Sequence, residues 1–234
     1  MKDITEQVRR RLLDAGADLV GMADLSAVKE AGFPRGISVA VKLPEQVVGE
    51  IRSGPTAEYH KAYKDINARL NALVSEGAEF LTSLGYNALA NTTENVVRLP
   101  ENRTQLPHKT VAVLSALGWI GKSNLLVTPR YGSAVRLSSI LTDAPLETAG
   151  APLASLCGEC QICRQVCPGK AILGNHWSAG TDRDDMFRMR VCEATANRLS
   201  GENFGDPEAE ICGICLANCP FTLRYLNEVG SRGE

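Results

Sequence analysis

The chain carries, in its last third, the stretch Cys157-Gly-Glu-Cys160-Gln-Ile-Cys163-Arg-Gln-Val-Cys167-Pro168. This Cys-x2-Cys-x2-Cys-x3-Cys-Pro spacing is typical of a tight loop that wraps a [4Fe–4S] cubane. Three thiolates of such a run bind one cluster, and the fourth binds a second cluster. A further set of ligands must therefore lie elsewhere in the chain.

The remaining cysteines supply that set. The chain has eight cysteines in all, and the other four are Cys192 and the run Cys212-x2-Cys215-x3-Cys219-Pro220. The crossover of the fourth ligand predicts two ligand sets. One set is Cys157, Cys160, Cys163 and Cys219, and the other is Cys167, Cys192, Cys212 and Cys215.

Two other uses of eight cysteines stay open. Four disulfides would need an oxidising compartment, but Met1-Lys2-Asp3-Ile4 leads into a charged helix and does not read as a signal peptide. Paired Cys-x2-Cys units also bind zinc, although zinc sites seldom interleave such a run ending in proline. The spacing, and not the number of cysteines, favours two cubanes.

Length and charge limit the remaining functions. A two-cluster module needs only the residues from about Cys157 onward, so some 150 residues of this 234-residue chain need another purpose. The net charge is −2, with 25 basic and 27 acidic side chains, which makes nucleic acid an unlikely partner. The longest apolar stretches, 37–41 and 111–117, are too short to span a membrane. We expect a cytoplasmic protein with no membrane partner, because thiolates stay reduced in that compartment.

Hydrophobic periodicity predicts helices over 5–15, 55–84, 107–117 and 184–199 and a last helix from 219, and strands over 18–23, 36–41, 86–90 and 134–141. The helix over 184–199 would carry Cys192. A linker over 149–152 separates an α/β core, residues 1–150, from a ferredoxin-like double-cluster domain, residues 151–234. The expected fold class is α+β (α/β-like).

A glycine-rich segment precedes the strand over 134–141. It lacks the four-residue gap of a phosphate-binding loop, so we reject nucleotide binding there. The segment Ala116-Leu-Gly-Trp-Ile-Gly-Lys-Ser-Asn-Leu125, with Tyr131-Gly132-Ser133 and Leu141-Thr142-Asp143, resembles the epoxyqueuosine reductases, as does the order of the cysteines. That family is related to the reductive dehalogenases. The resemblance implies a nitroreductase-like core that holds cobalamin and two clusters that pass electrons to its cobalt. It assigns contacts with the corrinoid to Gly121, Lys122, Ser123, Asn124, Tyr131 and Ser133. For Lys122 the alternative is a tight turn with a solvated side chain.

The chain departs from the family pattern in two places. The family's proton-donating aspartate falls on Asn102 here, and an amide cannot serve as a general acid. The adjacent Glu101 is the candidate replacement. The chain also stops at Glu234, where full-length enzymes of the family continue into a helical-repeat domain that helps hold tRNA, so we expect a short form.

Three histidines, His60, His108 and His176, are too scattered in sequence to predict a metal site. His108 stands at the start of a helix, where it could face a corrinoid side chain or solvent.

Three hypotheses of function follow. The leading one is an iron–sulfur oxidoreductase that passes single electrons through two [4Fe–4S] clusters to a cobalamin-type cofactor. The alternative is an electron-transfer or corrinoid-handling partner protein without substrate chemistry of its own. The third is a short epoxyqueuosine reductase that acts on tRNA. Expected partners are a low-potential electron donor, such as ferredoxin or flavodoxin, and a corrinoid or corrinoid protein.

Overall fold

The computed structural model describes residues 3–230, which divide into two compact units. Each unit is assembled from separate stretches of the chain: residues 3–42, 65–119 and 136–153 form the first, and residues 43–64, 120–135 and 154–230 form the second. These units do not coincide with the ranges 1–150 and 151–234 expected above. The last stretch of the second unit begins at Ala154, close to the linker expected over 149–152.

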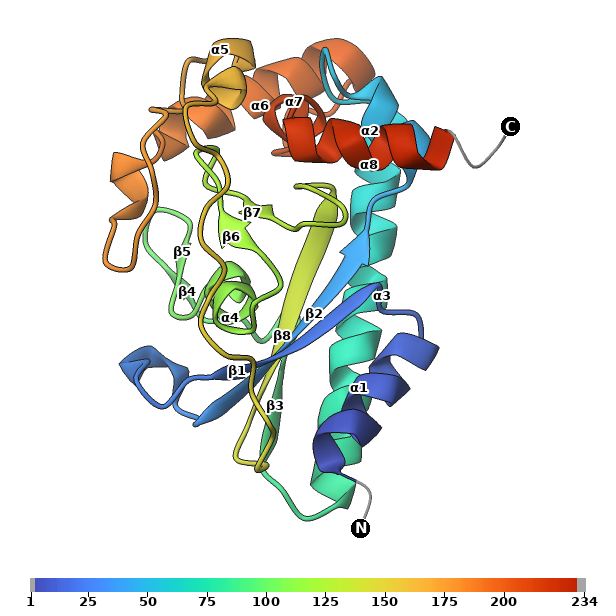
Figure 1. The fold of residues 1–234 in the computed structure, drawn as a ribbon. Helices are drawn as coiled ribbons and strands as arrows, with labels where there is room; N and C mark the ends of the chain where they lie inside the picture. The colour runs from blue at the N-terminus through green and yellow to red at the C-terminus, as the bar shows by residue number, and fades with distance from the viewer. Residues whose placement is uncertain (1–2, 231–234) are drawn as a thin grey trace. The chain divides into compact units, whose positions relative to one another are not determined.

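The first unit is built on a four-stranded sheet in the order β1-β2-β8-β3 (Figure 1). Its strands are β1 (Leu19–Asp24), β2 (Arg35–Lys42), β3 (Ala88–Asn91) and β8 (Val135–Thr142). The pairs β1–β2 and β3–β8 are antiparallel. All four strands were predicted within two residues of these bounds, because β-branched and alternating apolar residues mark them in the sequence.

Successive residues of β8 face opposite sides of the sheet. Ile140 lies against α3 (Ala57–Ser83), where a Cβ on Gly77 would meet its side chain. Leu141 packs on the other side in a buried cluster with Val111 of α4 (His108–Leu114). Helices therefore cover both faces, which explains why β2 is buried almost throughout.

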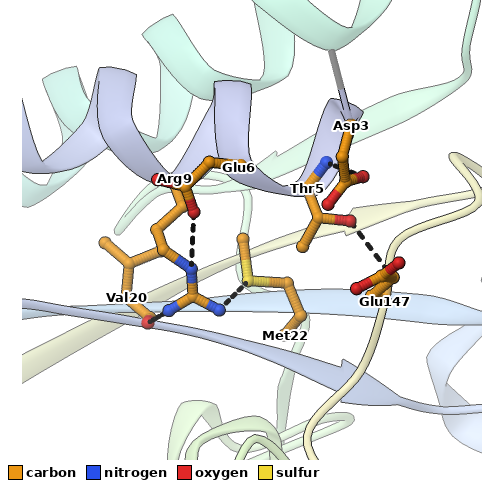
Figure 2. A network of polar contacts seen from close by, with 7 residues as sticks. All are labelled: Asp3, Thr5, Glu6, Arg9, Val20, Met22 and Glu147. Carbon is orange, nitrogen blue, oxygen red and sulfur yellow. Dashed lines mark hydrogen bonds and ion pairs between the residues drawn. The ribbon is translucent and has the colours of Figure 1, made fainter. Parts of the chain in front are cut away.

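Helix α1 (Ile4–Asp14) is fixed to the sheet by polar contacts near its start (Figure 2). The Arg9 guanidinium donates to the Val20 carbonyl oxygen at 2.7 Å and to the Met22 sulfur at 3.2 Å. The backbone N–H of Glu147 donates to the Thr5 hydroxyl at 2.9 Å. These bonds tie the segment after β8 to the helix expected over 5–15.

The first unit also contains a short hairpin and a one-turn helix. Strands β4 (Arg98–Leu99) and β5 (Arg103–Thr104) pair antiparallel, and η1 is a 3-10 helix over Lys29–Ala31. Neither was predicted. Helix α4 is shorter than the helix expected over 107–117, because Ala116 takes a left-handed conformation, with φ 55°, just after its end.

The second unit holds every cysteine. Its elements are α2 (Glu45–Glu50), β7 (Leu126–Val127), α5 (Ile162–Val166), η2 (Arg183–Asp185), α6 (Met189–Phe204), α7 (Ile214–Ala217) and α8 (Pro220–Gly230), and β7 pairs with β6 (Trp119–Ile120). Helix α6 begins later than the predicted residue 184, because η2 and the buried Met186 precede it, but it does carry Cys192. The α+β fold class is confirmed.

No helix within residues 3–230 combines the length and the apolar character that a membrane crossing requires.

Candidate iron–sulfur centres

The first group of thiols comes from the long cysteine run and from the start of α8. Cys157 and Cys160 lie on a turn closed by the Cys160 N–H, which donates to the Cys157 carbonyl oxygen at 2.9 Å. Burial, with smaller contributions from the charges of Cys157, Cys160 and Cys219, raises the pKa of Cys163 to about 11. Cys219, just before α8, is likewise raised in pKa, first by burial and then by Cys157 and Cys160. These four sulfurs therefore share one electrostatic neighbourhood.

The second group joins α6, α7 and the last cysteine of the long run. Burial, with smaller contributions from the charges of Cys212 and Cys167, raises the pKa of Cys192 to about 11. Cys215 is half-buried, and burial raises its pKa strongly, with contributions from Cys212, Cys192 and Cys167. The two groups adjoin, since Cys163 of the first also acts on Cys215.

The donor chemistry of both groups suits an iron–sulfur cluster. All eight cysteines are free thiols, and each group offers four soft sulfur ligands. Burying several thiols together favours their neutral form, and iron would reverse this because a coordinated thiol loses its proton. The groups in the structure agree with the ligand sets predicted from the sequence, although ligation itself stays a prediction.

Among residues 3–230, no three Cys, His, Asp or Glu side chains converge as the ligands of a single metal ion would. A cubane has a wider cage than a single ion, since each of its four thiolates binds a different iron atom.

A backbone N–H group also donates a hydrogen bond to one of the cysteine sulfurs. The Ala171 N–H donates to the Cys167 sulfur at 3.3 Å, and Ala171 itself is fully buried. Hydrogen bonds to a cluster sulfur raise its reduction potential by stabilising added negative charge. The sequence signal for this donor is only the Pro168-Gly169 turn after Cys167, and we did not predict the contact.

The Lys122 side chain is hydrogen-bonded to the loop that carries the first cysteines. Its ammonium group donates to the Gly158 carbonyl oxygen at 2.6 Å, and only 4% of the residue is exposed. A Cβ on Gly121 would lie 3.5 Å from the Cys157 sulfur and 2.8 Å from Val127. The alternative of a solvated lysine is therefore wrong, because the residues from Gly121 onward form a tight backing for the first cysteine turn.

The other residues assigned to corrinoid contacts lie in the same unit. Asn124 is buried in a left-handed turn with φ 61°, while Ser123 is half-buried. The buried ring of Tyr131 meets Tyr225 edge-on, with centroids 5.2 Å apart. The Ser133 N–H donates to the Thr222 hydroxyl at 3.0 Å. Among the described residues, the buried Ser133 hydroxyl has no hydrogen-bond partner, and such an orphaned group fits a polar side chain of a corrinoid.

Glu101 and Asn102 lie at the exposed tip of the β4–β5 hairpin. Both take left-handed conformations, with φ 61° and 53°. Such a turn accommodates asparagine readily and glutamate less readily. Glu101 as proton donor stays a prediction.

The three histidines have separate surroundings. His60 lies 3.5 Å from the Asp206 carboxylate and beside the Phe204 ring. His108 is bonded through Nδ1 to the Ser139 hydroxyl at 3.0 Å, and burial, with the Arg136 charge second, lowers its pKa to about 4. His176 is exposed in a loop.

Known proteins resemble most of the chain. No family model matches the sequence. An epoxyqueuosine reductase of Listeria monocytogenes is 29% identical over 231 residues, which cover 92% of this chain and 57% of that protein. An epoxyqueuosine reductase of Synechococcus sp. is 44% identical over 134 residues, covering 53% of this chain and 38% of that protein. A tetrachloroethene reductive dehalogenase of Sulfurospirillum multivorans is 28% identical over 121 residues, covering 47% and 23%.

The chain is thus similar to epoxyqueuosine reductases over most of its length. Solved structures share its fold. A catabolic reductive dehalogenase matches with a TM-score of 0.69 at 16% identity, over 95% of this chain and 33% of that one. An epoxyqueuosine reductase from Streptococcus thermophilus matches with a TM-score of 0.61 at 18% identity, over 94% and 66%. The chain thus spans a little over half of the Listeria enzyme, and about two fifths of the Synechococcus one. The homologous epoxyqueuosine reductases and reductive dehalogenases use [4Fe–4S] clusters and cobalamin, which agrees with the cofactors expected from the sequence.

Proposed function

We propose that the chain is an iron–sulfur oxidoreductase that passes single electrons through two [4Fe–4S] clusters to a corrinoid. The observation that carries this proposal is the gathering of the eight thiols into two adjoining groups of four. A relay needs two such centres close together, and Cys163 and Cys215 bring the groups next to each other. Similarity to epoxyqueuosine reductases and reductive dehalogenases supports the corrinoid as the acceptor.

The residues of the chain would hold and tune these centres. Four thiolates would bind each cluster, and the Ala171 N–H would favour the reduced state of the cluster at Cys167. Lys122 would fix the turn at Gly158, so that Cys157 and Cys160 point at one centre. The Ser133 hydroxyl would bond a polar group of the corrinoid. A bound corrinoid supplies a cobalt that becomes strongly reducing once it receives electrons.

Reduction of epoxyqueuosine in tRNA is the second candidate for the substrate chemistry. It is supported by the curated relatives, which carry the name epoxyqueuosine reductase. One structural relative, with a TM-score of 0.50 at 14% identity, was solved with an epoxyqueuosine-modified tRNA stem loop. The expectation that nucleic acid is an unlikely partner is therefore not supported. Glu101 is the acid that we propose for this reaction.

The hypothesis of a partner protein without its own chemistry has no support among the relatives. A cytoplasmic location remains a prediction.

Two measurements test the proposal. Anaerobic reconstitution should load about eight iron atoms per chain, as two cubanes require. Adding cob(II)alamin should then change the cobalt EPR spectrum as the corrinoid binds. An iron content of about four or less would contradict the two-cluster relay, and an unchanged cobalt spectrum would contradict the corrinoid acceptor. Glu101→Gln, assayed with epoxyqueuosine-containing tRNA, should abolish turnover if Glu101 is the acid.

A further inference from the structure

A surface depression of about 530 Å³ lies beside the cluster thiols in the second unit. Its lining comes from α5, from the turn after Cys167 and from the residue before α6, and consists of Gln161, Arg164, Gln165, Lys170, Ile172, Leu173 and Arg188. Arg164, Lys170 and Arg188 are exposed, and no aspartate or glutamate is part of the lining. The depression is therefore a local basic site on a chain whose net charge is −2.

One apolar side chain belongs both to the lining of this depression and to a cluster with cysteines of the second thiol group. Ile172 is part of the lining and is only 5% exposed. On its inner side it packs in one cluster with Cys167, Cys192 and Cys215. The Arg188 carbonyl oxygen accepts the Cys192 N–H at 3.0 Å, which ties the rim of the depression to the same group.

We propose that this depression is where an acidic one-electron carrier protein docks and delivers its electron. The inference rests on the proposed relay and names the partner that feeds it. The rate of electron transfer falls steeply with distance, so a carrier must approach a cluster closely, and Ile172 both lines the depression and packs with the thiols. The carrier loses one electron and the cluster held by Cys167 gains it. Opposite charge on the two faces steers their encounter and sets their orientation.

The charge and the lining favour a protein over RNA. A phosphate backbone is held by basic groups spread along an extended track. Here the basic groups surround a single depression, with two glutamine amides and the apolar Ile172 and Leu173 as its walls. A mixed apolar and polar lining with a charged rim is the usual anatomy of a protein–protein contact.

The test is a charge reversal, Arg164→Glu with Lys170→Glu, in the reconstituted full chain. Photoreduced flavodoxin is the probe, and stopped-flow absorbance follows the bleaching of the clusters at low salt. We expect the second-order rate constant to fall at least about tenfold, because steering contributes about 10- to 1,000-fold to such rates. At high salt, where charges are screened, the difference should largely disappear. Arg164→Lys with Lys170→Arg should retain the rate.

Two controls separate this proposal from the relay itself. Arg10→Glu, at an exposed position of α1, makes a charge reversal outside the unit that holds the cysteines and should leave the rate unchanged. Excess dithionite should reduce the clusters of wild type and charge-reversal variant to the same extent. If dithionite bleaches neither, the relay has failed. If dithionite bleaches both and flavodoxin reduces both at one rate, the docking site is refuted. A variant that loses affinity for a tRNA stem loop, but keeps the flavodoxin rate, also refutes it.

Discussion

Gly132→Ala should damage one cluster in particular, because Gly132 lies against the start of α8. Gly132 has φ +56°, and a Cβ built on it would overlap the backbone nitrogen of Thr222 and lie 2.6 Å from the Phe221 carbonyl carbon and the Thr222 Cα. Ordinary contact begins at 3.4 Å, so the backbone of α8 must retreat by about 0.8 Å or more. That retreat would move Cys219, which directly precedes α8.

Three contributions determine how much Gly132→Ala lowers the free energy of unfolding. The left-handed conformation costs alanine about 1 kcal/mol. Displacing packed backbone costs about 1–3 kcal/mol. Weakening the bond from the Ser133 N–H to the Thr222 hydroxyl costs about 1 kcal/mol. A total of about 3–5 kcal/mol lowers the melting midpoint by about 6–20 °C for a chain of this size. Iron content should fall toward half as the cluster at Cys219 is lost.

Gly205→Ala is the matched control. Gly205 also has positive φ, +78°, and ends α6 in the same unit, but a Cβ there would meet nothing within 4 Å. Only the conformational term applies, so its melting midpoint should fall by about 2–4 °C and its iron content should stay at the wild-type value. Anaerobic thermal melts and iron analysis compare the two variants. Equal shifts, with full iron in both, would refute the reasoning.

Four further variants test the site and its support. Cys219→Ser and Cys215→Ser should each remove a different cluster, so their EPR spectra should differ; identical spectra would contradict the two ligand sets. Lys122→Met removes the bond to Gly158, so we expect the first cluster to bleach several-fold faster in air than in the wild type. Bleaching at the wild-type rate would show that this bond does not protect the cluster. His108→Asn tests a pH effect. The unfolded histidine has a pKa near 6.5, so below this pH the unfolded chain binds more protons than the folded one, whose His108 pKa is about 4. Wild type should thus lose about 2 kcal/mol of stability between pH 8 and pH 5, and the variant should lose correspondingly less, as urea titrations at both pH values would show.

The parts of the fold that the sequence predicts are those set by local pattern. The strands β1, β2 and β8 carry alternating or β-branched residues, and each was found within two residues of its expected bounds. The start of α6 was missed because Arg183 to Asp185 forms a 3-10 turn instead of the first turn of the helix. Helical periodicity cannot distinguish these, since both turns have similar spacing.

The candidate site likewise has features that local sequence predicts and features that only tertiary packing determines. Cysteine spacing predicts the two ligand sets because a cubane restricts how a short loop can present its sulfurs. The contact between Lys122 and Gly158 joins residues 36 positions apart, and no local pattern specifies it. The proximity of Ile172 to both the thiols and the surface depression is likewise a product of tertiary packing.

The residues that carry the family resemblance fall into two groups with different structural roles. Gly121 and Lys122 back the cysteine turn, so their presence is explained by cluster packing alone. Ser133 is different, because its buried hydroxyl has no hydrogen-bond partner among the described residues.

The Ser133→Ala variant tests what this hydroxyl does. An unpaired buried hydroxyl opposes folding, and removing it, so that the side chain becomes a methyl group, should be neutral or slightly stabilising. Ser133→Ala should therefore melt at or just above the wild-type temperature. If the hydroxyl bonds a corrinoid, the variant should also bind cob(II)alamin about 5- to 10-fold more weakly, as the loss of about one hydrogen bond predicts. EPR titration with cob(II)alamin measures this affinity. Unchanged affinity with unchanged stability would mean that Ser133 takes no part in holding the corrinoid.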